Sequence, residues 1–442
     1  MQRGSAMRRR GYGAAANEAV DSLSNFIFLV WVAREMSAPE FGAFTVSYSI
    51  VQIGIGISQG VSTMPMMVRY ATSSWRTSRR LAGEVTGATV VVSMVMIAAF
   101  GVMAASSVGD PLASCSLAFA AVVTGLLLQN CCVLVFYNRE QVGRALQNNV
   151  LWLVIQLPLF VVLPAVFGSH SAWVYILGWG LAAYIATAIS LVQLRAVPRV
   201  DLFLGWFRRR RSSILDLSIE SVVNRFSAQS ATWALAGAAG LRATAGVRAG
   251  QIPLGIPRIF IVGLAPMGLA EGTRLYASRP RALRTFVRIW GAGNTAVCTL
   301  IGVGLMLMPS SWGRTMAGDS WQYARPLLLW VVLIAVGNAV LVPAQTGLKC
   351  LGVTRISAVV RTLTAPLAML GTVAGGLLEG GTAAVIGMAI GSLLSGVIAQ
   401  GVFEREFERR LVPPEQHGLA AVPVVSPPVV SPPATTEATA QV

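Results

Sequence analysis

The stretch Asp216-Leu-Ser-Ile-Glu-Ser-Val-Val-Asn224 repeats the pattern of Asn17-Glu-Ala-Val-Asp-Ser-Leu-Ser-Asn25. In both stretches an acid is followed by serine, an asparagine stands four residues after that acid, and the offset is 199 residues. A second pair matches at an offset of 201 residues, where Val61-Ser-Thr-Met-Pro-Met66 corresponds to Val262-Gly-Leu-Ala-Pro-Met267. Two matches at nearly one offset predict a duplicated chain of two similar lobes, whose repeated polar residues face a shared interface.

Composition places the chain in the membrane class. It has 442 residues, of which 55% are hydrophobic and 12% charged, and its mean hydropathy is +0.65. So few charges could not cover a soluble globule of this size, and the composition is typical of a polytopic membrane protein. The net charge of +16 does not indicate nucleic acid, because the basic residues cluster between apolar runs rather than on one face.

Apolar runs along the chain predict an all-α polytopic membrane protein with twelve transmembrane helices. A bilayer core of about 30 Å needs about 20 mostly apolar helical residues. Runs of this kind are centred near residues 26, 55, 93, 125, 158, 183, 225, 259, 296, 337, 367 and 393. With the N-terminus inside, 27 of the 34 basic residues fall in inside segments and 5 in outside segments. Since basic residues mark cytoplasmic loops, both termini are predicted to be cytoplasmic.

The same pattern divides the chain into two pseudo-symmetric six-helix lobes. We predict an N-lobe at residues 1–194, a cytoplasmic inter-lobe linker at 195–212 and a C-lobe at 213–404. The linker is the longest internal loop and carries the basic cluster Arg208–Arg211. Residues 405–442 contain Val-Val-Ser-Pro-Pro twice, a composition that cannot bury a core, so this tail is predicted to be disordered.

Catalytic and metal-binding patterns are missing from the sequence. The two histidines, His170 and His417, have no neighbouring metal-ligand residues, and the five cysteines lie in or beside apolar runs with no CxxC spacing. We therefore expect a protein that is not an enzyme, has no cofactor and no metal site, and uses its cysteines for core packing.

Acidic and amide side chains form a stripe on each of two predicted helices. Glu18, Asp21 and Asn25 share a face of the first helix, and Asp216, Glu220 and Asn224 share one of the seventh. Ionisable groups inside the hydrocarbon suggest function by default, so these four acids are candidate coupling or gating groups and the two asparagines candidate substrate ligands. The alternative for Glu18 and Asp216 is that they only complement a helix dipole.

Two arginines lie deep within predicted helices. Arg225 is twelve residues into the seventh helix, near mid-membrane, and Arg258 lies at a similar depth in the eighth. Together with Arg248, predicted in an outer segment, they are candidate ligands of an anionic substrate, because guanidinium forks suit phosphate oxygens. The alternative is a structural ion pair with Asp21 or Glu220.

Prolines interrupt two of these helices. Pro65 and Pro266 lie late in the second and eighth helices, and Gly255-Ile-Pro257 precedes Arg258. Breaks of this kind are tolerated where the freed backbone groups line a cavity, or they are ordinary packing kinks.

Three patches resemble the polysaccharide flippases of the multidrug/oligosaccharidyl-lipid/polysaccharide (MOP) exporter superfamily. Ser37-Ala-Pro-Glu-Phe-Gly-Ala-Phe44 is similar to that family's Gly-Pro-x-x-Phe-Gly turn. The other patches are Phe136–Asn149 and Met308–Leu327. The resemblance implies two six-helix lobes, alternating access, and a V-shaped cavity formed by the first, second, seventh and eighth helices. It also implies a cavity lined by basic residues for a lipid-linked pyrophosphate sugar, a description that Arg225 and Arg258 fit by depth and helix.

The function expected from this resemblance is flipping of a polyprenyl-linked pyrophosphate saccharide across the bacterial cytoplasmic membrane. Its expected partners are that substrate, membrane lipids and cell-envelope glycosyltransferases, with no nucleic acid, and we expect a monomer. One alternative is a cation-coupled exporter of the multidrug and toxin extrusion type, which would prefer an acidic cavity. Another is a non-transporting scaffold for cell-envelope enzymes that docks through the Pro-rich tail.

Overall fold

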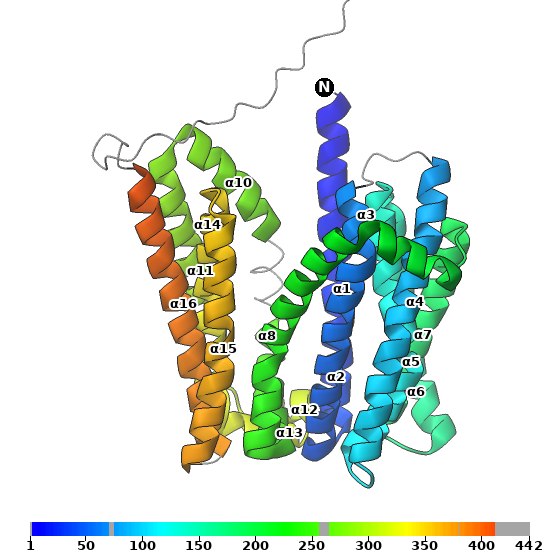
Figure 1. Ribbon diagram of the computed structural model, residues 1–442. Helices are drawn as coiled ribbons and strands as arrows, with labels where there is room; N and C mark the ends of the chain where they lie inside the picture. The colour runs from blue at the N-terminus through cyan, green and yellow to red at the C-terminus, as the bar shows by residue number, and fades with distance from the viewer. Residues whose placement is uncertain (1, 70–74, 256–264, 380, 412–442) are drawn as a thin grey trace, which may run out of the picture.

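The computed structural model describes residues 2–69, 75–255, 265–379 and 381–411. Within these ranges the secondary structure is helical, and most helices run roughly parallel in two groups, joined by the long helix α8 (Figure 1). The predicted disordered tail began at residue 405, but residues 405–411 are helical as the end of α16, so that boundary is wrong. Residues 412–442 and the nine-residue stretch 256–264 around Arg258 lie outside the described residues.

The N-lobe is built from the helices α1 to α7. Their bounds are α1 Gln2–Glu35, α2 Ala38–Ser58, α3 Met64–Arg69, α4 Trp75–Ser106, α5 Pro111–Asn138, α6 Val142–Phe167 and α7 Ala172–Leu194. The flippase-like patch at Ser37 is a helix start: the Glu40 carboxylate accepts hydrogen bonds from the Ser37 backbone N–H (3.2 Å) and hydroxyl (2.8 Å). A π-helical turn at Gln59–Thr63 precedes Pro65, and it widens the helix at the predicted break.

The rest of the chain forms α8 and the second group of helices. Their bounds are α8 Phe203–Gln251, α10 Ala265–Ser278, α11 Pro280–Leu307, α12 Ser310–Ala317, α13 Ser320–Ala324, α14 Leu328–Cys350, α15 Thr354–Glu379 and α16 Gly381–Leu411. The C-terminal end of α16 lies at the same end of the molecule as the N-terminal end of α1 (Figure 1). This end carries the segments predicted to be cytoplasmic.

Nine helices in the described ranges are long and apolar enough to cross a membrane. Nine of the twelve predicted centres, namely residues 55, 93, 125, 158, 183, 296, 337, 367 and 393, fall inside them. Residues 26 and 225 are also helical, in α1 and α8, but those helices are too polar to meet the same criterion. The multi-pass, all-helical architecture is confirmed in the described residues, while the count of twelve spans and the orientation of the termini stay predictions.

The predicted inter-lobe loop is largely helical. A turn at Val200–Leu202 leads directly into α8, so helical structure begins at residue 200 rather than 213. We call Phe203–Arg209 the linker helix, since α8 bends at Arg210 (φ −131°, ψ 15°). Trp206 is fully buried in an apolar cluster with Leu81 and Phe136 of the N-lobe, and its indole N–H donates to the Val61 carbonyl at 2.9 Å. The expectation of an 18-residue loop is therefore wrong, because an amphipathic face allows this segment to pack on the N-lobe.

A second interruption of α8 marks the turn between the predicted seventh and eighth helices. Gly240 has φ +80° and ψ 175°, a conformation that favours glycine, and the helix reverses direction there. The turn therefore lies between the predicted centres of the seventh and eighth helices, near residues 225 and 259. The returning segment loses its regular helical pattern after Gln251, and α10 begins again at Ala265. The predicted eighth helix is thus described as two separate pieces.

Candidate functional site

The long contact between α2 and α8 is the candidate functional site, and its backbones approach closely because glycine faces the partner helix. A Cβ added to Gly42 would lie 2.1 Å from the Leu241 carbonyl oxygen, and one added to Gly60 would lie 2.5 Å from the Ser218 Cα. Small residues permit such close packing of membrane helices. The seam, as we call the contact of α2 and the following turn Gln59–Thr63 with α8, therefore runs along most of α2.

Arg225 of α8 lies in the seam. Its Nη1 donates a hydrogen bond to the Gln52 Oε1 of α2 at 2.9 Å. Its aliphatic stem packs against Gly56, where an added Cβ would lie 2.6 Å from the Arg225 Cγ. The side chain is half-buried. A guanidinium is thus held between the two lobes by an amide partner and by the space that a glycine leaves.

Arg248 contacts the same helix from the returning piece of α8. Its guanidinium carbon lies 5.7 Å from the centre of the Tyr48 ring, within the range of a cation–π contact. Tyr48 and Gln52 are four residues apart, so they lie on one face of α2. The adjacent Ser49 hydroxyl accepts a hydrogen bond from the Trp233 indole. This face of α2 therefore contacts both Arg225, predicted near mid-membrane, and Arg248, predicted in an outer segment.

Asp21 and Asn25 are paired along one face of α1. The Asn25 side-chain amide donates to the Asp21 backbone carbonyl at 3.0 Å and to the Asp21 carboxylate at 3.3 Å. Both side chains are half-buried, whereas Glu18 is exposed. The alternative that Glu18 lies at a helix start is wrong, because α1 begins at Gln2. The partial burial of Asp21 is consistent with the coupling role, which stays a prediction.

A chain of buried amides lies one turn from Asp21 and was missed by sequence analysis. Asn17 donates to the Tyr137 hydroxyl at 2.7 Å and accepts from the Asn149 amide at 3.1 Å. Asn149 in turn accepts from the Gln129 amide at 2.6 Å. The three amide side chains are almost fully buried. Their hydrogen bonds therefore connect α1, α5 and α6 within the apolar N-lobe. Asn17 opened the repeated stretch, and Gln129 interrupts an otherwise apolar run; both were signals that could have been used.

Several predicted site residues cannot be located as side chains. Arg258 and Pro257 lie outside the described residues, and of Asp216, Glu220 and Asn224 only the helical backbone in α8 is described. The repeat therefore places its second polar stripe on the helix that forms the seam. No group of three or more metal-ligating side chains gathers in the part of the chain that the structure describes. The five cysteines are all buried, which confirms their core role.

A hollow of about 390 Å³ lies along α1 nearer its C-terminal end. It is lined by Phe26, Ile27, Val30, Trp31, Arg34 and Glu35. The lining is largely apolar with one charged pair at its edge, so it differs in character from the polar contacts of the seam.

Comparison with known proteins finds similarity in structure rather than in sequence. No protein family model matches the chain, and no curated protein matches it by sequence. A multidrug-resistance MATE transporter of the MOP superfamily, solved in an inward-facing conformation, superposes with a TM-score of 0.67 at 13% identity, covering 92% of this chain and 100% of that one.

Two further structures have the same architecture. The lipid II flippase MurJ in an inward closed conformation gives a TM-score of 0.67 at 10% identity, covering 90% of this chain and 89% of that one. A MOP superfamily transporter from Pyrococcus furiosus gives 0.56 at 14% identity, covering 92% and 96%. These neighbours come from the superfamily that the sequence patches resemble, and the chain therefore has the fold of the MOP transporters.

Proposed function

We propose that this protein is a flippase that moves a polyprenyl-linked pyrophosphate saccharide from the inner to the outer leaflet of the bacterial cytoplasmic membrane. The observation that supports this most strongly is the convergence of Arg225 and Arg248 on one face of α2. Two guanidiniums between the lobes suit the oxygens of a pyrophosphate, while the lipid tail stays in the bilayer. The fold shared with MurJ, described as a lipid II flippase, supports the same class of cargo.

Alternating access is the mechanism that this fold supports. At the end where α1 finishes, the lobes contact each other, since α12 packs on α1 and α13 packs on α2. The superposition is better with the inward-facing MATE structure (TM-score 0.67) than with an outward-facing one (0.55). Both observations support a state in which the cargo reaches the seam from the cytoplasm. Cargo and coupling ion would each shift the equilibrium only by their difference in affinity for the two states.

A multidrug and toxin extrusion function is the second candidate. It is favoured by the pairing of Asp21 with Asn25 on α1, since a carboxylate would attract an organic cation, and by the equal TM-score of the MATE neighbour. The two candidates differ in which side chain the cargo needs: the arginines for an anionic head, the carboxylate for a cation.

A deletion strain complemented with variants separates these candidates. We expect the deletion to accumulate lipid-linked oligosaccharide on the inner leaflet, and we expect Arg225→Gln or Arg248→Gln to restore less than a tenth of the wild-type flux, because each removes a charge-assisted contact. Arg242→Gln is the matched control, since Arg242 is exposed on the same piece of α8 as Arg248. Sensitivity to cationic dyes without lipid accumulation would refute the flippase proposal and favour drug export.

A further inference from the structure

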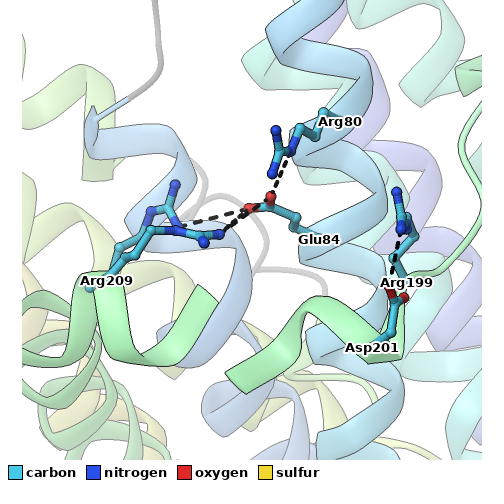
Figure 2. Close-up of polar contacts among 6 residues, drawn as sticks. Arg80, Glu84, Arg199, Asp201 and Arg209 are labelled. Atoms are coloured by element: carbon cyan, nitrogen blue, oxygen red, sulfur yellow. Dashed lines mark hydrogen bonds and ion pairs between the residues drawn. The ribbon is translucent and has the colours of Figure 1, made fainter. Parts of the chain in front are cut away.

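A buried carboxylate at the cytoplasmic end of the N-lobe gathers more positive charge than it can neutralise. Glu84 of α4 is 2% exposed. Its oxygens lie 3.2 Å from the Arg80 Nε, 3.5 Å from the Arg209 Nη2 and 3.8 Å from the Arg210 Nη1. Figure 2 shows Arg80 and Arg209 reaching Glu84 from different sides, one from α4 and the other from the linker helix. The two exposed guanidiniums of Arg80 and Arg209 share this one carboxylate, which neutralises only one of their two positive charges.

Among the described residues, the contacts next to Arg80 and Arg209 add no second carboxylate. Arg79 donates to the backbone carbonyl of Arg195 at 2.7 Å, which leaves its charge in place. Asp201 is paired with Arg199 at 3.0 Å and so balances an arginine outside the cluster (Figure 2). The Glu84 cluster, by which we mean Glu84 with Arg80, Arg209 and Arg210, therefore remains electropositive.

The cluster also lies where lipid headgroups would reach it. α4 begins at Trp75 and its long apolar stretch follows Glu84, so Arg80 lies in the polar first turns of a helix that is apolar enough to cross a membrane. The side chains of Arg80 and Arg209 are 69% and 52% exposed, while Arg210 is 8% exposed and stacks over the Trp206 ring at 4.0 Å. Arg210, at the bend that follows the linker helix, is thus held against the protein, while the linker helix presents Arg209 at the surface.

We propose that the Glu84 cluster is a binding site for the phosphodiester headgroup of an anionic membrane phospholipid. Two exposed guanidiniums that share one buried carboxylate are a preorganised fork for phosphate oxygens, and an anion there relieves the repulsion between Arg80 and Arg209. The bound lipid would hold the linker helix on α4. The inference requires that the chain lies in a membrane, and it does not depend on the cargo, so its failure would leave the proposed function untouched.

Lipid retention measured by native mass spectrometry tests this site on the full-length protein. We expect wild-type protein taken from phosphatidylglycerol nanodiscs to retain phosphatidylglycerol, and from phosphatidylcholine nanodiscs to retain less lipid. The double variant Arg80→Gln/Arg209→Gln is expected to bind phosphatidylglycerol about tenfold more weakly, because two basic contacts at the surface are lost. The charge-retaining variant Arg80→Lys/Arg209→Lys should bind less tightly than wild type, because it loses both guanidinium forks, and more tightly than the glutamine variant, because it keeps both charges. This comparison separates loss of charge from misfolding.

The matched control distinguishes a site from general attraction of a basic surface. Arg281 and Arg405 are exposed arginines at the same end of the molecule, in α11 and α16. If Arg281→Gln/Arg405→Gln weakened binding as much as the test variant, or if the test variant retained wild-type binding, the site would be refuted. A second experiment measures the melting temperature of the protein with inorganic phosphate and with phosphatidylglycerol. Stabilisation by phosphate equal to that by phosphatidylglycerol would overturn the assignment to a lipid.

Discussion

Asn149 occupies the centre of the buried amide chain in the N-lobe, donating to Asn17 and accepting from Gln129. A buried polar group that loses its partner costs about 1–3 kcal/mol. The packing of α1, α5 and α6 against one another therefore depends on the hydrogen bonds of a single side chain, Asn149. Its closeness to Asp21 also means that the stripe on α1 is anchored at one end, which limits how far the carboxylate can move.

Replacing Asn149 tests this role at the residue scale. Asn149→Leu should lower the free energy of unfolding by about 2 kcal/mol, because Asn17 loses a donor and Gln129 an acceptor. Thermal unfolding in detergent measures the effect. Gln147→Leu serves as control, since Gln147 is exposed on the same helix. Equal stability of the two variants would show that the amide chain contributes little.

At the scale of elements, the helices that fail the hydropathy criterion are the informative ones. α1 and α8 carry the polar stripes and Arg225. These polar residues lower the mean hydropathy of both helices, so neither is among the nine apolar spans. The apolar spans could be predicted because bilayer thickness fixes their length. The partner of Arg225 could not, because Gln52 lies 173 residues away and no local pattern encodes that contact. The linker was predicted as a loop because of its basic cluster Arg208–Arg211. The spacing of Phe203, Trp206 and Phe207, which share one helix face, could have indicated an amphipathic helix.

The glycines of the seam give a prediction at this same scale. Gly42→Ala and Gly60→Ala should each destabilise the protein by about 1–3 kcal/mol and reduce transport, because the added methyl would meet the backbone of α8 and force the helices apart. The melting temperature and the rate of transport can be measured together. Gly101→Ala is the control, since nothing lies within 4 Å of its Cβ position. A tolerated methyl at Gly42 would contradict the close packing of α2 on α8.

At the scale of the whole molecule, the contact between α12 and the end of α1 joins the two lobes. Gly318 has φ +54°, and a Cβ there would lie 2.6 Å from the Arg34 carbonyl oxygen. This turn therefore combines a backbone conformation suited to glycine with a close approach between lobes. Breaking the contact should favour the state in which this end is open, by an amount set by the strain introduced.

Gly318→Ala tests that expectation. Spin labels on Val108→Cys and Leu378→Cys, one exposed site in each lobe, should report a larger population of long distances in the variant. Gly352→Ala is the matched control, because Gly352 also has a positive φ (+73°) but nothing lies within 4 Å of its Cβ position. Identical distance distributions in wild type and Gly318→Ala would show that this contact does not hold the lobes together.

The burial of Trp206 in the N-lobe bears on how the chain can be divided. A polypeptide ending at residue 194 would keep the apolar notch formed around Leu81 and Phe136 but lose the indole that fills it. Such a truncated half would expose this apolar surface, and the Val61 carbonyl would lose its hydrogen-bond donor. We expect the exposed apolar surface to promote aggregation during biosynthesis. Split-gene or topology-reporter fusions should accordingly be joined downstream of the linker helix. The first half is then synthesised together with Trp206, which covers its apolar surface.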